Sequence, residues 1–319
     1  MTVAIATIAT DGMIFGAADT MLTSGDIEFE PIRSASPNLG KIAPLTASIM
    51  ALWAGDAAIQ AEIILSHLQP MVKAAIDKEK RWLGVEEVVF MYIDAYNMVK
   101  HRRAQTQILS PLGLTFDSFI SRQKEMSPEF VQKVGRALSE FALSPIETII
   151  TGNEPNPIGD GTRPRIYKLQ NDDAVCYDFI RFAAIGGGSR HAESHLMLSR
   201  HCSLTPPAQA LLATYIAKKK SEIAPGVGTE TNFAVIGSAL GAFNWLPEHI
   251  MNQCHAAYEE WKKREAASIK TAENEFDSYL MSIAQAATRD QAEAQKEQPQ
   301  TGPSTTDAPT PPPAAPANP

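Results

Sequence analysis

MTVAIATIATDGMIFGAADTMLTSGD, residues 1–26, decides the fold. Val3 to Ala9 is small, apolar and β-branched with little polar alternation, which is typical of a strand covered on both faces. Asp11-Gly12 is a strong two-residue hairpin signal, because both positions accept a positive φ. Met13 to Ala18 is therefore predicted to return antiparallel to the first strand. This hairpin brings Asp19 back beside the start of the chain.

Lys41 is the only lysine in the first 72 residues, and its neighbours in the sequence are apolar. A lysine on a buried strand needs a partner of opposite charge, or its pKa falls. Asp19, at the end of the returning strand, is the candidate partner. A surface lysine whose ammonium reaches solvent is the alternative that the spacing leaves open.

Gly55 follows the predicted strand Ser48–Ala54 and precedes the helical run AAIQAEIILSHL, residues 57–68. A glycine at such a junction exposes backbone N–H groups near a helix N-terminus, where an oxyanion can bind. A plain turn glycine is the alternative interpretation.

The chain resembles a proteasome β-type subunit and its bacterial relatives in the order of four features. These are the hairpin, the segment AADTMLTSG (17–25), the isolated lysine and the segment AGDAA (54–58). The resemblance implies that Asp19 and Lys41 are an active-site pair and that Gly55 supplies the oxyanion amide. Lys41 and Gly55 are 14 residues apart, which is the family's spacing. Asp19 and Lys41 are about six residues further apart than in the family, and the excess falls in the polar segment 26–37, where a longer loop costs little.

The family's nucleophile is an N-terminal threonine, and the resemblance gives this role to Thr2 after removal of Met1. A gapless count back from Asp19 falls on Val3 instead, and a bulge or a longer hairpin arm is expected to absorb the difference. A free α-amino group has a pKa of roughly 7.7–8.0, so it can take the proton of its own hydroxyl. With Met1 retained, that nitrogen is an amide and has no basicity.

The resemblance also assigns the substrate contacts. The backbone of Thr23 would bind an extended peptide, and Ser189 is the candidate support for the amine, because the family's supporting serine falls on Gly187. A shallow apolar pocket, which predicts a preference for small or medium apolar side chains, would be lined by Leu22, Ala43, Trp53 and Ala57.

The composition excludes several classes of protein. The chain has 319 residues, 44% of them hydrophobic, a mean hydropathy of −0.14 and a net charge of −8. The negative charge argues against nucleic-acid binding, and no apolar run is long enough to span a membrane. The cysteines 176, 202 and 254 are far apart and form no CxxC pair, which fits a reducing, cytoplasmic location. No metal or cofactor is expected.

The periodicity of apolar residues predicts the remaining elements. Residues 1–245 are expected to form one domain with a helical insertion at about 105–145, followed by a C-terminal helix at 246–289. Residues 290–319 are rich in proline and alanine and are expected to be disordered. Other helices are predicted at 57–68 and 71–80, broken at Pro70, and at 85–103 and 203–220, and strands at 147–152, 165–170, 174–180 and 232–236.

The resemblance implies an α+β fold of the four-layer αββα sandwich type. It further implies a threonine-type endopeptidase that hydrolyses peptides or unfolded proteins within a ring or ring-like assembly of identical subunits, without nucleic-acid or membrane partners. Two alternatives stay open. One is a catalytically silent structural subunit of the same fold, and the other is an N-terminal-nucleophile amidase that acts on a small molecule.

Overall fold

The computed structural model describes residues 2–24, 27–29, 40–55 and 58–296. Within these ranges lie seven α-helices and two antiparallel five-stranded sheets, so the predicted α+β class is confirmed. Residue contacts divide the chain into two units, Met1–Tyr258 and Glu259–Pro319.

The first sheet is built around the N-terminal hairpin and has the strand order β10-β1-β2-β11-β12. The hairpin strands pair from Ala4 opposite Ala18 to Ile8 opposite Ile14 without an interruption of register. These pairs contain no bulge, so that expectation is wrong for them, and the longer hairpin arm stays a prediction. The strands are β1 (Ala4–Ile8), β2 (Ile14–Asp19), β10 (Phe182–Ile185), β11 (Thr231–Ile236) and β12 (Phe243–Trp245).

The second sheet has the order β5-β6-β7-β8-β9 and contains the strands that follow Lys41 and end at Gly55. A separate two-stranded ribbon joins β3 (Leu22–Ser24) and β4 (Ile27–Phe29). The five strands of the second sheet are β5 (Ile42–Pro44), β6 (Ile49–Gly55), β7 (Ile146–Pro155), β8 (Thr162–Gln170) and β9 (Asp173–Cys176).

Both faces of β1 are buried, as its uniformly apolar sequence predicts. Ala4, Ala6 and Ile8 belong to a core that also contains Leu52 and other residues of the second sheet, so this face lies between the two sheets. Val3 and Ile5 belong to a different core that includes helix residues. Alternate residues of one strand therefore pack on different layers.

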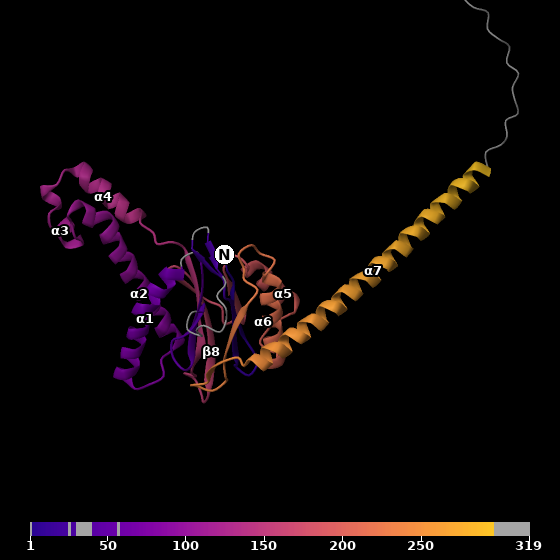
Figure 1. Ribbon diagram of the computed structural model, residues 1–319, viewed down its shortest axis with the longest axis horizontal. Helices are drawn as coiled ribbons and strands as arrows, with labels where there is room; N and C mark the ends of the chain where they lie inside the picture. Colours follow the sequence, from indigo (N-terminus) through magenta and orange to yellow (C-terminus); the bar gives the residue numbers. More distant parts are fainter. Residues whose placement is uncertain (1, 25–26, 30–39, 56–57, 297–319) are drawn as a thin grey trace, which may run out of the picture. The chain divides into compact units, whose positions relative to one another are not determined.

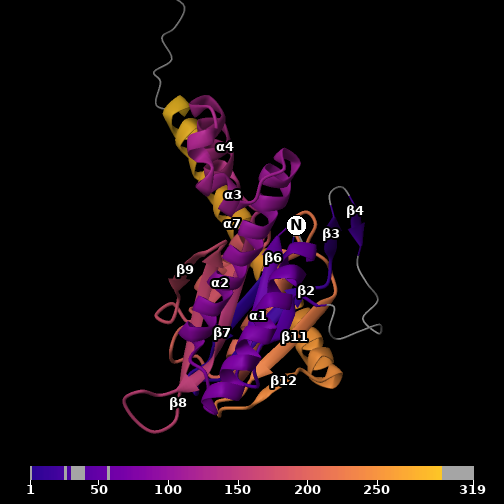
Figure 2. The same cartoon turned by 90° about the vertical axis from the view of Figure 1, so that its left-hand side faces the viewer.

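Two helix pairs cover the outer faces of the sheets (Figure 1). The helices α1 (Ala58–Glu79) and α2 (Val85–Ala104) pack on the second sheet, and α5 (Ser189–Leu198) and α6 (Pro207–Ser221) pack on the first. Figure 2, turned by 90°, shows α1 and α2 side by side over the strands. The prediction for α2 is confirmed to within one residue.

The predicted break at Pro70 is wrong, because α1 continues through it. Pro70 lies on the exposed side of the helix, while Leu68 and Val72 are buried against the second sheet. Packing of these neighbours offsets the hydrogen bond that proline cannot donate.

The segment predicted as a helical insertion forms short helices between residue 105 and residue 140, and it has a small core formed by Leu109, Leu114, Phe119 and Val134. Ser127 caps the last of its helices by accepting a hydrogen bond from the amide of Phe130 at 3.3 Å. The insertion consists of η1 (Gln105–Leu109), η2 (Ser110–Leu112), α3 (Phe116–Ser121), η3 (Gln123–Glu125) and α4 (Pro128–Glu140).

The C-terminal helix α7 (Glu248–Lys296) is longer than predicted. Residues 290–296 are helical and not disordered as predicted, and residues 297–319 lie outside the described ranges. The first turns of α7 belong to the first unit, where Met251 and Cys254 pack near Phe15 and Phe233. Among the described residues, none of the helices combines the length and apolar character of a membrane-spanning segment.

Candidate active site

Thr2, Asp19 and Lys41 meet at the end of the N-terminal hairpin. The Lys41 ammonium lies 2.9 Å from Asp19 Oδ1 and also donates to the Thr2 hydroxyl, which in turn donates to Asp19 Oδ1. All three residues are buried, with Thr2 only 2% and Lys41 only 6% exposed. The surface-lysine alternative is therefore wrong, and the structure places Asp19 as the ion-pair partner that the sequence indicates.

Backbone amides complete the surroundings of the Asp19 carboxylate, which is fully buried. The amide of Val3 donates to Oδ1 at 2.9 Å, and the amide of Gly228 donates to Oδ2 at 3.1 Å. Together with Lys41 and Thr2, these donors offset the free-energy cost of burying a charge. The carboxylate thus has a fixed orientation toward the threonine and the lysine.

The contacts of Thr2 and Val3 show which of the two residues is at this site. The Val3 side chain packs in the core shared with α5 and α6. The Thr2 hydroxyl instead contacts Lys41 and Asp19. Thr2, and not the Val3 reached by a gapless count along the sequence, is therefore the residue at this site.

The loop at residues 186–188 contacts the backbone of Thr2. The Thr2 carbonyl accepts a hydrogen bond from the amide of Gly188 at 3.3 Å. Gly186 has a φ of +85°, and a Cβ added there would collide with the Thr2 carbonyl and lie 2.9 Å from the Cβ of Ala54. The end of β6 is therefore packed against the loop that holds Thr2.

Gly55 immediately follows Ala54 and is the last residue of β6. It is exposed and has a φ of +145°, and Pro145 and Ile146 would crowd any side chain there. The structure thus brings Gly55 to the same end of the sheets as Thr2. A glycine is needed here for backbone reasons alone.

The structure does not bring Ser189 into the hydrogen-bond network of Thr2. Ser189 is the first residue of α5, and its amide donates to the carbonyl of Gly186 at 3.0 Å. Its hydroxyl makes no hydrogen bond within the described part of the chain. Gly187, where the family's serine falls, is exposed.

Of the four residues of the predicted specificity pocket, the structure describes the side chains of Ala43 and Trp53. Ala43 pairs with Ala51, so Ala43 and Trp53 share the face of the second sheet that packs on α1 and α2. Leu22 and Thr23 are in β3, with Thr23 opposite Glu28, and their side chains are outside the described part, as is Ala57. Ala43 and Trp53 are both half-buried.

Sequence reasoning missed Glu147, which holds the Gly186 loop. Glu147 Oε2 accepts a hydrogen bond from the amide of Gly186 at 2.5 Å, and Glu147 is the cross-strand neighbour of Ala54. A glutamate at the start of the apolar segment 147–152 was the available signal, because a charge beside a buried strand needs a partner. Its partner is 39 residues away, so the sequence could not identify it.

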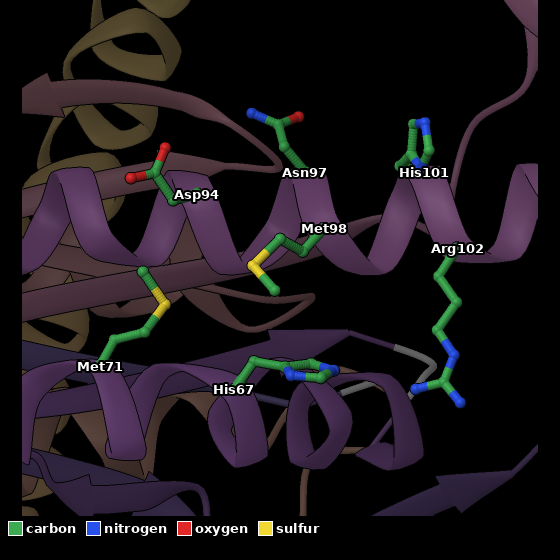
Figure 3. Close-up of a pocket in the computed structure, with 7 residues that line it drawn as sticks. All are labelled: His67, Met71, Asp94, Asn97, Met98, His101 and Arg102. Atoms are coloured by element: carbon green, nitrogen blue, oxygen red, sulfur yellow. The ribbon is translucent and has the colours of Figure 1, made fainter. Parts of the chain in front are cut away.

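A hollow of about 750 Å³ lies between α1 and α2 and shares no residue with the Thr2 cluster. In Figure 3 the side chains of Met71 and Met98 point into the space between the two helices. The hollow is lined by His67, Met71, Asp94, Asn97, Met98, His101 and Arg102.

Comparisons of the chain with known protein families and with curated proteins give no match.

Proposed function

We propose that this chain is a threonine-type peptidase of the N-terminal-nucleophile class and that Thr2 is its nucleophile. The observation that carries the proposal is the Thr2 hydroxyl, which is hydrogen-bonded to both the Lys41 ammonium and the Asp19 carboxylate. Two facing sheets with a helix pair outside each also fit the four-layer αββα sandwich of that class.

In the proposed reaction, Thr2 Oγ1 attacks the carbonyl carbon of the scissile amide. The hydroxyl proton passes to the α-amino nitrogen of the same residue, which requires that Met1 has been removed. The C–N bond then breaks, the proton goes to the leaving amine, and water hydrolyses the resulting ester. Lys41 stabilises the developing alkoxide by its charge, and Asp19 holds Lys41 in place.

Gly55 is the proposed oxyanion donor. Its amide is at the end of β6, next to the Ala54 side chain that approaches the Thr2 loop. An amide that binds the tetrahedral oxyanion typically contributes about 3 kcal/mol to stabilisation of the transition state. Within the proposal, the substrates are peptides or unfolded proteins, and identical subunits form a ring or ring-like assembly.

One observation favours the silent subunit as a second candidate. Ser189, the candidate support for the amine, lies outside the hydrogen-bond network of Thr2. A silent subunit retains the fold and the buried ion pair but hydrolyses no amide. The small-molecule amidase is distinguished from the peptidase by turnover of peptides.

The proposal predicts that Thr2→Ala abolishes hydrolysis of fluorogenic peptides. Loss of the nucleophile is expected to lower kcat by about 10³-fold or more. The matched control is Thr7→Ala, on β1, which removes a buried hydroxyl bonded to Thr214 Oγ1 at 2.7 Å but touches nothing at the site. Equal turnover by wild type and Thr2→Ala, or none by either, would refute the peptidase.

The pocket prediction is tested with a peptide panel that varies the residue before the scissile bond. Small and medium apolar side chains are expected to give the highest kcat/KM, and Trp53→Ala is expected to shift the preference toward larger apolar ones. One methylene in an apolar pocket changes kcat/KM by about 10-fold or more. A wild-type preference for acidic or basic side chains would contradict the assignment.

A further inference from the structure

Lys218, in the last turn of α6, is a buried lysine outside the proposed reaction. Its side chain is fully buried, and its ammonium makes three hydrogen bonds. They go to Glu222 Oε1 at 2.6 Å and to the carbonyls of Gly228 and Thr229, both at 2.9 Å. An ammonium has three N–H donors, so these acceptors use all of them.

The loop that Lys218 binds is the loop that holds Asp19. The amide of Gly228 donates to Asp19 Oδ2, while the carbonyl of the same residue accepts from Lys218. Val227, just before it, is anchored in the core between the first sheet and its helices. One residue thus connects the buried ammonium to the carboxylate at the site.

We propose that Lys218 is a positioning residue, which fixes the 222–229 loop so that the Gly228 amide holds Asp19 toward Lys41 and Thr2. The anchoring of the loop by Lys218 does not depend on any reaction. The effect of Lys218 on turnover rests on the proposed function, because it requires that the orientation of Asp19 governs turnover. Lys218 touches neither Thr2 nor the reacting atoms in this arrangement.

Lys219 is the natural comparison, since it has two of the same partners. Its ammonium is 2.8 Å from Glu222 Oε1 and 3.0 Å from the Thr229 carbonyl, and its side chain is 15% exposed. No hydrogen bond joins it to Gly228 in the described structure. Lys219→Met therefore removes the same charge from the same loop without freeing the Gly228 carbonyl.

Lys218→Met is expected to fold, because burying an ammonium is costly and methionine has a similar volume. Glu222 keeps Lys219 as a partner, so no carboxylate is left without a counter-charge. The change that remains is the loss of the donor to the Gly228 carbonyl. A loss of activity in this variant would then not be explained by unfolding.

Burial lowers the pKa of Lys218 to about 8, opposed by Glu222 and Asp19 and assisted by the charge of Lys219. Between this value and the ordinary lysine pKa of roughly 10.4, the unfolded chain holds one more proton than the folded chain at this position. The free energy of unfolding of the wild type is therefore expected to rise with pH across that interval, relative to Lys218→Met. A flat difference would contradict the buried position of the ammonium.

The deciding experiment measures hydrogen exchange of residues 222–231 and peptide turnover in wild type, Lys218→Met and Lys219→Met. Lys218→Met is expected to exchange at Gly228 about 10-fold faster and to lower kcat about 10-fold with KM nearly unchanged, as for other residues that orient a reacting group. Lys219→Met is expected to stay within about twofold of wild type in both.

The two proposals fail separately. Wild-type exchange rates and kcat in Lys218→Met would overturn the positioning role. If the wild type has no turnover, the peptidase proposal fails, and exchange at Gly228 alone decides whether Lys218 anchors the loop.

Discussion

Lys41→Met is expected to lower kcat/KM for peptides by about 10³-fold or more. A fall of this size is typical when a residue that works together with the nucleophile is removed. The ammonium is the only charged donor to the Thr2 hydroxyl in the described structure, and methionine cannot replace it. The variant also leaves Asp19 buried without its ion-pair partner, which typically costs 3–5 kcal/mol, so about that loss of stability is expected. Steady-state kinetics and urea unfolding measure the two effects.

Stability and catalysis are separated by the double variant Lys41→Met/Asp19→Asn. Asparagine removes the uncompensated charge, so much of the lost stability is expected to return while activity does not. Lys219→Met serves as the lysine control away from Thr2. A folded Lys41→Met protein with wild-type kcat/KM would contradict the role given to the ammonium.

Gly186→Ala is expected to damage both the fold and the reaction. A residue with a side chain at φ +85° costs about 1–2 kcal/mol for the backbone alone. The new Cβ would also press on the Thr2 carbonyl, and overpacking of this kind costs about 1–3 kcal/mol more. Displacement of Thr2 by about 1 Å is expected to lower kcat about 10²-fold.

Gly161→Ala is the matched control for Gly186→Ala. Gly161 has a φ of +93°, and a Cβ added there has nothing within 4 Å. It therefore carries the backbone cost without the collision, and activity is expected to stay at the wild-type level. Thermal unfolding and peptide kinetics of both variants test this, and equal losses in the two would show that the Thr2 contact is unimportant.

The local parts of the fold could be predicted from the sequence because their signals are local. The Asp11-Gly12 turn and two apolar runs predict the hairpin that the structure contains. The helix break predicted at Pro70 is wrong for a physical reason. The packing of α1 on the second sheet outweighs the local preference of proline, and the sequence does not display that packing.

The candidate site was predictable in part. The isolation of Lys41 among apolar residues, together with Asp19 at a strand end, indicated the ion pair that the structure contains. Glu147 and Lys218 were not predictable, because the partner that matters for each is a backbone group, the amide of Gly186 and the carbonyl of Gly228, which no side-chain pattern in the sequence marks. Lys218 stands in a run of three lysines that is typical of a solvated helix end, and only the fold shows that it is the buried one.

The proposed peptidase depends on a Thr2 hydroxyl that becomes a nucleophile once its own amine is free. Its most direct test is mass spectrometry of the purified protein after treatment with a β-lactone, with the modified residue mapped by fragmentation. We expect a chain that lacks Met1 and carries one ester adduct on Thr2, with no adduct in Thr2→Ala. Retained Met1, or an adduct on another residue and none on Thr2, would contradict the account.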